Sequence, residues 1–112
     1  MKKIEAVIKP FKKDDVTRAL IALGIKGMTV YDVEGFGRQR GHAEHLHGDE
    51  YMIDLLPRTK IEFIIEDALV EQVIDAISIN AKTGKIGDGK VFIYPIEEVV
   101  RIRTGERGNK AL

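Results

Sequence analysis

Lys3-Ile4-Glu5 recurs in this chain as Lys60-Ile61-Glu62, an offset of 57 positions from residue 3 to residue 60. Each copy opens a stretch in which apolar residues alternate with other residues, which is the period of a β-strand. Further pairs keep the same offset: Val16 and Val73, Ala19 and Ala76, Leu20 and Ile77, and Gly27 and Gly84. We therefore interpret the chain as two matched strand–helix–strand units joined by a long loop.

The spacing of the apolar residues locates the elements of each unit. Alternation predicts strands at about residues 4–8, 28–35, 61–65 and 91–94. Helical spacing predicts one helix that starts at Asp14 and Asp15 and stops at Gly24, and a second that starts near Asp67. Residues 96–100 are predicted to be a link, and residues 101–104 a last extended piece.

Two matched units predict an α+β fold, a ferredoxin-like βαββαβ sandwich with a long loop after the second strand. Both helices would cover one face of four antiparallel strands and leave the other face uncovered. Met28, Val30, Phe36, Phe92 and Tyr94 indicate that the uncovered face is not wholly polar. We therefore expect self-association that covers it.

The composition is that of one soluble globular domain, with 112 residues of which 44% are hydrophobic and 32% charged. Lysine and arginine total 18, as do aspartate and glutamate, so any anion site must come from local clustering. The absence of cysteine excludes disulfides, thiolate metal sites and a cysteine nucleophile. No apolar run is long enough to span a membrane, and a cytoplasmic protein is expected.

The run Thr83-Gly84-Lys85-Ile86-Gly87-Asp88-Gly89-Lys90 is the main candidate for a binding site. Its glycines permit positive φ and close approach of a ligand. Converging backbone amides, together with the two lysines, suit an anion such as a polyphosphate. The run is not a Walker A motif, because no Gly-x-x-x-x-Gly-Lys-Ser/Thr pattern occurs in the chain. An ordinary surface turn between a helix and a strand remains the alternative at this point.

Arg101 and Arg103 add two guanidinium groups shortly after this run. In an extended segment, residues two positions apart point the same way. The pair and the glycine run together favour a polyphosphate ligand.

Residues 37–54 form a long connection without periodicity, and loops of this length are usually functional or disordered. Its charges and glycines suit an arm that orders on a partner. His42, His45 and His47 with nearby acids are candidate metal ligands, although a preformed metal site needs a rigid scaffold. Tyr51 is either a modification target or a ring that packs at the base of the loop.

Taken together, these motifs resemble the PII nitrogen-regulatory signal-transduction family over nearly the whole chain. The runs that carry the resemblance are Met1-Lys2-Lys3-Ile4-Glu5-Ala6, Lys9-Pro10-Phe11, Gly27-Met28-Thr29-Val30, Gly35-Phe36-Gly37-Arg38-Gln39, Glu50-Tyr51, residues 83–90 and residues 101–106. The resemblance implies one domain over residues 1–112 and a compact homotrimer with a nucleotide site in each cleft between neighbours. Residues 37–55 look like the T-loop, residues 83–90 like the B-loop, and residues 101–106 like the C-loop of the adjacent subunit.

The resemblance also implies that ATP and ADP compete for this cleft. The residues it implies for the phosphates are Gly87, Asp88, Gly89, Lys90, Arg38, Arg101 and Arg103. Those it implies for the base and ribose are Thr29, Gly35, Phe36, Gly37 and Ile64. Gln39 would be the side-chain ligand of Mg²⁺. The effector 2-oxoglutarate would bind beside Mg·ATP, with Gln39, Arg40, Gly41, Arg58 and Gly87 around it.

Two places depart from the family pattern. Arg58 stands where the family normally has a lysine that pairs with the far carboxylate of 2-oxoglutarate, and its planar fork places the charge differently from an ammonium group. At the loop tip, Ala43 and His45-Leu46-His47 stand where many members have Thr and Leu-Tyr-Arg. The resemblance implies that this arginine enters an ammonium-transporter pore. His47 would fill that role only with a charge that depends on pH.

The function that the resemblance implies is that of a non-catalytic sensor. Its T-loop would control an ammonium transporter, or enzymes or regulators of nitrogen assimilation, according to which ligand is bound. A cytoplasmic protein of this kind could be recruited to the membrane by the transporter. Tyr51 matches the tyrosine that is uridylylated or adenylylated in many members.

Three other classes remain as alternatives. An ATP-binding phosphotransferase or slow ATPase would need a positioned base, for which Asp88 is the nearest candidate. An RNA-binding domain of the same fold is indicated only by Gly35-Phe36-Gly37, which partly matches the aromatic motif of such domains. A trimeric metal-tolerance protein of similar fold would rest on the loop histidines alone.

Overall fold

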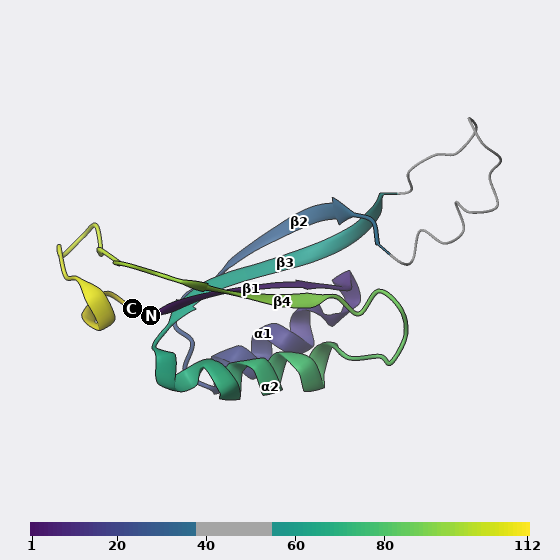
Figure 1. Ribbon diagram of the computed structural model, residues 1–112, viewed down its shortest axis with the longest axis horizontal. Helices are drawn as coiled ribbons and strands as arrows, with labels where there is room; N and C mark the ends of the chain where they lie inside the picture. The colour runs from purple at the N-terminus through teal and green to yellow at the C-terminus, as the bar shows by residue number, and fades with distance from the viewer. Residues whose placement is uncertain (38–54) are drawn as a thin grey trace.

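The computed structural model describes residues 1–37 and 55–112. In chain order, its main elements are β1 (Lys2–Ile8), α1 (Lys13–Ala22), β2 (Thr29–Gly35), β3 (Leu56–Ile65), α2 (Val70–Ala81) and β4 (Lys90–Pro95). Short 3-10 turns η1 (Pro10–Lys12) and η4 (Asp67–Leu69) precede the helices, and η5 (Gly108–Ala111) lies near the C-terminus. The α+β class and the order of the elements are confirmed (Figure 1).

The strands form one antiparallel sheet in the order β2-β3-β1-β4. Both helices pack against each other on one face of this sheet (Figure 1). Residue Ile4 of β1 lies opposite Phe63 of β3 on one side and Ile93 of β4 on the other. This arrangement confirms the ferredoxin-like sandwich.

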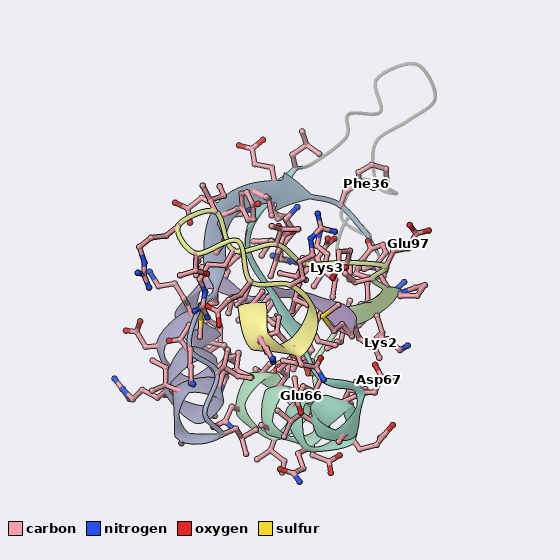
Figure 2. All side chains as sticks on the ribbon, turned by 90° about the vertical axis from the view of Figure 1, so that its left-hand side faces the viewer. Lys2, Lys3, Phe36, Glu66, Asp67 and Glu97 are labelled. Carbon is pink, nitrogen blue, oxygen red and sulfur yellow. The ribbon has the colours of Figure 1, made fainter. Side chains whose placement is uncertain are left out.

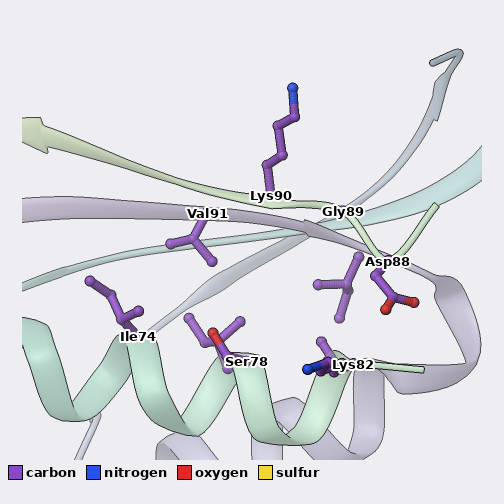
Figure 3. A pocket seen from close by; sticks show the side chains of 10 residues that line it. Ile74, Ser78, Lys82, Asp88, Gly89, Lys90 and Val91 are labelled. Atoms are coloured by element: carbon purple, nitrogen blue, oxygen red, sulfur yellow. The ribbon is translucent and has the colours of Figure 1, made fainter. Parts of the chain in front are cut away.

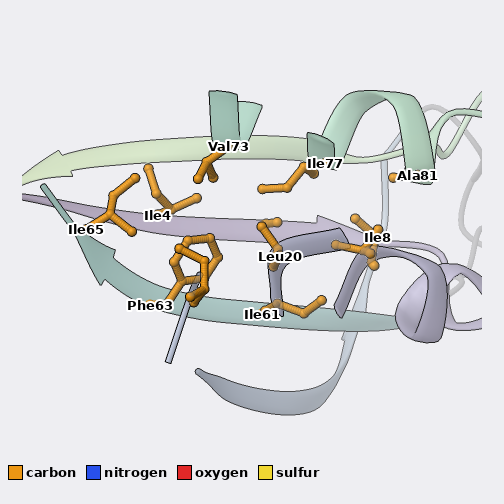
Figure 4. Packing of buried hydrophobic residues seen from close by; sticks show 12 residues of the cluster. Ile4, Ile8, Leu20, Ile61, Phe63, Ile65, Val73, Ile77 and Ala81 are labelled. Atoms are coloured by element: carbon orange, nitrogen blue, oxygen red, sulfur yellow. The ribbon is translucent and has the colours of Figure 1, made fainter. Parts of the chain in front are cut away.

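The core follows directly from the two periods in the sequence. Alternate residues of β1 and β3 are buried, and the helices contribute residues at helical spacing. The resulting cluster fills the space between sheet and helices (Figure 4). Its members are Ile4, Ala6, Ile8, Val16, Leu20, Ile25, Ile61, Phe63, Ile65, Val73, Ile77 and Ala81.

The internal repeat extends to the way in which each helix begins. Pro10 to Lys12 and Asp67 to Leu69 are 3-10 turns of three residues at the same offset of 57 positions. Asp67 also binds the start of β1, because its Oδ1 lies 3.6 Å from Nζ of Lys2 (Figure 2). The second helix is thus joined to the first strand at the end of the sheet where residues 24–28 also lie.

The prediction that residues 101–104 are extended is wrong. Residues 102–104 form a turn, and Val100 and Arg107 form an isolated antiparallel bridge around it. The amide of Gly105 donates to the carbonyl of Arg101 at 2.8 Å, and the amide of Arg101 donates to the carbonyl of Glu106 at 2.9 Å. Strand alternation therefore does not align Arg101 with Arg103.

The face of the sheet without helices is mixed in character. Phe92 and Tyr94 lie opposite Glu5 and Lys3 of β1, which confirms that both aromatic residues are on this face. Met28 is wrongly predicted there, because it packs against the buried core. Val30 is also on the helix side, since it lies opposite the buried Ile61.

A polar network crosses the uncovered face. The hydroxyl of Tyr31 donates to Oε1 of Glu62 at 2.9 Å, and Nζ of Lys3 lies 3.2 Å from Oε2 of the same carboxylate. Nζ of Lys60 lies 4.6 Å from the ring centroid of Tyr31. The hydrogen bond from Tyr31 is the main cause that lowers the pKa of Glu62, with Lys3 adding to it.

Replacing Tyr31 by phenylalanine is expected to lower the unfolding midpoint at neutral pH by a small amount. A lowered pKa of Glu62 in the folded state contributes stability above the unfolded pKa, and this contribution is lost as pH falls through the folded pKa. The difference between Tyr31→Phe and the parent chain should therefore shrink on acidification. Thermal unfolding at pH 7 and pH 3 measures this. Tyr94→Phe is the control, and equal pH dependence of the two variants would contradict the role of Tyr31.

Candidate functional site

The glycine run connects α2 to β4 and adopts the conformation that its composition predicts. Gly84, Gly87 and Gly89 have φ values of +83°, +97° and +104°. A Cβ at Gly89 would lie 1.7 Å from the carbonyl oxygen of Val7. The loop therefore passes directly against the end of β1, which is possible only with glycine at this position.

The carboxylate of Asp88 binds the beginning of its own loop. Its Oδ2 accepts hydrogen bonds from the amides of Thr83 at 2.8 Å and Gly84 at 2.9 Å, and its Oδ1 accepts one from the hydroxyl of Thr83. Nζ of Lys9, at the end of β1, lies 3.2 Å from Oδ1. The hydrogen bond from the Thr83 hydroxyl is the leading cause that holds the pKa of Asp88 far below its usual range.

The second part of the loop is left open. Within residues 1–37 and 55–112, no hydrogen-bond partner is found for the amides of Ile86 and Gly87. A pocket of about 320 Å³ lies between α2 and the loop, and Asp88 and Lys90 project to opposite sides of the backbone there (Figure 3). Amides without a partner in the described part of the chain, in a loop that also contains Lys85 and Lys90, suit an anion.

A second, cationic pocket adjoins the loop and the end of the β2–β3 hairpin. It measures about 580 Å³ and is lined by Lys9, Phe11, Arg58 and Lys85 with Pro10 and Thr83. Arg58 donates from Nη1 to the carbonyl of Pro57 at 2.8 Å. Lys9 is paired with Asp88, which leaves the charges of Arg58 and Lys85 at this hollow to suit a carboxylate or phosphate ligand.

A third pocket lies at another part of the sheet and contains two residues expected at the base and ribose. It measures about 780 Å³, and Thr29, Glu62 and Ile64 contribute to it together with Lys3 and the last residues of the chain. Thr29 is on β2 and Lys90 on β4, the two opposite edges of the sheet. Three strand spacings of about 4.8 Å separate these edges.

Arg101 and Arg103 lie beyond the far end of β4. Arg101 is held by Glu106, with Nη1 to Oε1 at 2.9 Å, and by the carbonyl oxygen of Leu112 at 3.1 Å. Arg103 is exposed, and Ile102 between them is 99% exposed. In Figure 1, this segment and the glycine loop lie at opposite ends of the molecule.

One chain therefore does not bring all the predicted site residues together. β4 has 6 residues, from Lys90 at the end of the glycine run to Pro95. At about 3.3 Å per residue, the strand alone spans roughly 17 to 20 Å, which is longer than an arginine side chain. Asp88, Gly89 and Lys90 line one pocket, and Arg58 lines another with Thr83 and Lys85 of the same loop. Thr29 and Ile64 share a third pocket, and the segment of Arg101 and Arg103 remains apart from the loop.

Several predicted residues lie outside the described residues. These are Arg38, Gln39, Arg40, Gly41 and Tyr51, and the loop histidines His42, His45 and His47. Among the residues that are described, no group of three or more His, Cys, Asp or Glu side chains could hold a metal ion. No helix in the same part of the chain is long and apolar enough to cross a membrane.

Sequence reasoning assigned no role to Lys9, although its side chain is only 12% exposed and contacts the loop. Its Nζ donates to Oγ1 of Thr83 at 3.0 Å, across 74 positions of sequence. A lysine at the end of a predicted strand carries no local pattern that indicates such a contact. Only the pairing of β1 with β4 brings the two segments together.

Comparison with known proteins identifies the family of this chain. A family model described as "Nitrogen regulatory protein P-II" matches residues 1–106. The chain belongs to this family. Its relatives include the nitrogen regulatory protein P-II of Rhodospirillum rubrum, 61% identical over 112 residues, and nitrogen regulatory protein P-II 1 of Escherichia coli K12, 55% identical over 112 residues. Both alignments cover the whole of both chains.

A solved P-II structure agrees with the fold described above. The crystal structure of Arabidopsis thaliana PII bound to citrate aligns with a TM-score of 0.81 and 40% sequence identity. The alignment covers 99% of this chain and 91% of that chain. P-II membership thus confirms the family resemblance, the ferredoxin-like fold and a regulatory role in nitrogen metabolism.

Proposed function

We propose that this P-II chain senses ATP or ADP together with 2-oxoglutarate, in clefts between the subunits of a homotrimer. The observation that carries the proposal is the division of the predicted phosphate ligands between two distant parts of one chain. The glycine loop lies at one end of β4, with amides at Ile86 and Gly87 that have no hydrogen-bond partner among the described residues, and Arg101 and Arg103 lie beyond the other end. A neighbouring copy can supply the second group to the first.

Exposed apolar residues support the homotrimer. Ile102 is 99% exposed at the tip of its turn. On the face without helices, Phe92 is 42% exposed and Tyr94 is 41% exposed. Contacts of the head-to-tail type close into a ring when the rotation between copies is right. A three-fold ring would bury these residues and deliver Arg103 to the next subunit.

The proposed cleft assigns each residue to one part of the ligand. The phosphates would be held by Arg38, Gly87, Gly89 and Lys90 of one subunit and by Arg101 and Arg103 of the next. The base and ribose would lie among Thr29, Gly35, Phe36, Gly37 and Ile64. Mg²⁺ would be bound by Gln39 and the phosphates, and 2-oxoglutarate would lie near Gln39, Arg40, Gly41, Arg58 and Gly87. Backbone amides and arginine forks are the donors that phosphate oxygens prefer.

The cationic pocket at Lys9, Arg58 and Lys85 supports a carboxylate effector. The Arabidopsis PII protein was crystallised with citrate, which is also a polycarboxylate. Arg58 can form two parallel hydrogen bonds to one carboxylate, whereas lysine presents a single ammonium point charge. We therefore expect Arg58 to accept the far carboxylate of 2-oxoglutarate.

The output of the sensor is proposed to be the T-loop, residues 37–55. Ligands at its base would change which loop conformation is populated, and a partner would bind one conformation better than another. The expected partners are an ammonium transporter, or an enzyme or regulator of nitrogen assimilation. The protein would work in the cytoplasm, with the transporter recruiting it to the membrane, and Tyr51 would be the site of modification.

An ATP-binding phosphotransferase or slow ATPase is the less favoured function. Its best candidate for a general base is Asp88, whose carboxylate is already bound by Thr83, Gly84 and Lys9. The strongly lowered pKa of Asp88 also makes it a poor proton acceptor near neutral pH. The relatives of this chain are named as regulatory proteins, in agreement with a non-catalytic role.

Mg·ATP is expected to bind about tenfold more tightly when 2-oxoglutarate is present, and 2-oxoglutarate should gain the same factor from Mg·ATP, because linkage is reciprocal. Isothermal titration calorimetry in both orders measures the two factors. Arg58→Gln should remove the linkage and leave ATP binding in place. Calorimetry that shows ATP binding without any linkage would reject the effector part of the proposal, and no ATP binding at all would reject the sensor.

A further inference from the structure

We propose that Lys9, Thr83 and Asp88 form a clamp that positions the glycine loop for phosphate binding, so that Asp88 acts as a positioning residue and not as a ligand. The inference rests on the proposed nucleotide function, which it deepens. The three residues come from the end of β1, the segment after α2 and the loop itself. We call them the Lys9–Thr83–Asp88 clamp.

The first argument is that the carboxylate of Asp88 is fully engaged within the loop. Oδ2 accepts two backbone amides, and Oδ1 receives the Thr83 hydroxyl and lies 3.2 Å from Lys9. A carboxylate has about four lone-pair sites, so these four donors occupy it. Its side chain is only 24% exposed. Asp88 therefore has no free oxygen directed toward a ligand.

The second argument is that Thr83 links the other members of the clamp. Its Oγ1 donates to Asp88 and accepts from Nζ of Lys9 at 3.0 Å and from the amide of Lys85 at 3.2 Å. The amides of Thr83, Gly84 and Lys85 are thus all used inside the loop. This fixes the first half of the loop against β1.

The third argument is the division of the loop into a bound half and an open half. With three amides used by the clamp, those of Ile86 and Gly87 have no hydrogen-bond partner among the described residues. Lys90 projects to the side of the backbone opposite Asp88 (Figure 3). The clamp holds the first half of the loop and uses none of the Ile86 and Gly87 amides. A loop held in this way binds more strongly, because less of it must be ordered by the ligand.

For the loss of the Asp88 charge, the clamp predicts a change in nucleotide affinity opposite to the one that simple electrostatics predicts. Removing a negative charge near a polyphosphate should tighten nucleotide binding if Asp88 acts only through its field. Removing a clamp residue should weaken binding, because the binding-competent loop becomes a smaller fraction of the population. Asp88→Asn keeps the shape of the side chain and changes its charge and one acceptor oxygen.

Asp88→Asn in the full chain is expected to weaken Mg·ATP binding about tenfold, measured by calorimetry at fixed salt concentration. Asp75→Asn is the matched control. Asp75 is an exposed residue of α2, so this substitution removes the same charge at a position away from the loop. Hydrogen–deuterium exchange without nucleotide should show faster exchange at the amides of residues 83–85 in Asp88→Asn only. Circular dichroism at the temperature of measurement establishes that each variant is folded.

A double-mutant cycle separates a clamp from two independent effects. Lys9→Gln alone should weaken nucleotide binding, and combining it with Asp88→Asn should add little, because the two residues act through one contact. Thr83→Val serves as a second clamp variant that leaves both charges in place, and it should also weaken binding. It keeps the test decisive if Asp88→Asn does not fold.

Two results would overturn the clamp: nucleotide binding by Asp88→Asn as tight as or tighter than that of the parent chain, or unchanged exchange at residues 83–85. Additive effects in the cycle would also overturn it. A parent chain that binds no ATP would instead overturn the proposed function, and with it the role of the clamp in binding. In that case the exchange data would still decide whether the clamp holds the loop.

Discussion

Gly89→Ala is expected to lower the free energy of unfolding by about 4 kcal/mol, from strain at positive φ combined with overpacking against β1. Gly89 has φ +104°, and a Cβ there would lie 1.7 Å from the carbonyl oxygen of Val7 and 2.8 Å from its carbonyl carbon. Both neighbours are backbone atoms, so the clash cannot be relieved by rotating a side chain. The loop must then move away from β1 and take the start of β4 with it.

Denaturant unfolding at a fixed protein concentration measures this loss. Gly27→Ala is the matched control, because among the described residues only its own chain neighbours lie within 4 Å of an added Cβ, and its φ is not positive. This variant should unfold close to the parent chain. If Gly89→Ala were as stable as Gly27→Ala, the result would contradict the close contact between the loop and β1.

Arg103→Gln is expected to weaken Mg·ATP binding by about 30-fold or more, because a charge-assisted hydrogen bond to phosphate is lost. Lys90→Gln should have a similar effect from the other side of the cleft. Arg18→Gln, an exposed arginine on α1, is the control and should bind ATP normally. Neither substitution touches the buried core, so folding should be retained.

The decisive measurement combines Lys90→Gln and Arg103→Gln, the two variants expected to bind ATP weakly, in one assembly. Lys90→Gln and Arg103→Gln chains, co-expressed with different tags, should form mixed trimers. In each mixed trimer one cleft receives Lys90 from one chain and Arg103 from its neighbour, and that cleft should bind with parent affinity. Purified mixed trimers that bind no better than the separate variants would contradict a site shared between copies.

The sequence was informative wherever one face of an element is buried. Ile4, Ala6 and Ile8 must alternate because β1 has the helices on one side only, and Val73 and Ile77 repeat at helical spacing for the same reason. The start of β3 was missed because Pro57 and Arg58 lie on the part of the hairpin that pairs with Glu34 and Val33. Neither residue is buried there, so no alternating pattern is required.

The candidate site was predicted in part. The three glycines of residues 83–90 are a local requirement of a tight loop, so composition alone indicated them. The turn at residues 102–104 was missed because hydrogen bonds between Arg101, Gly105 and Glu106 determine it, and none follows from an alternating pattern. The resemblance to the P-II family, confirmed by the match over residues 1–106, identified the regulatory class.

The sequence by itself determined the two repeated units, the sheet with helices on one face, the glycine loop and the family. The units, the sheet and the loop depend on the periodicity and local conformation of neighbouring residues, which a single sequence contains. The family followed from the resemblance of its motifs. Only the tertiary structure decided that Asp88 turns inward to Thr83 and Lys9, and that the segment after β4 lies at the opposite end of the molecule from the glycine loop. The physical reason is that the pairing of β1 with β4 brings residue 9 beside residue 88. The length of β4 separates the two sets of predicted phosphate-binding residues, which lie in the glycine loop and around Arg103.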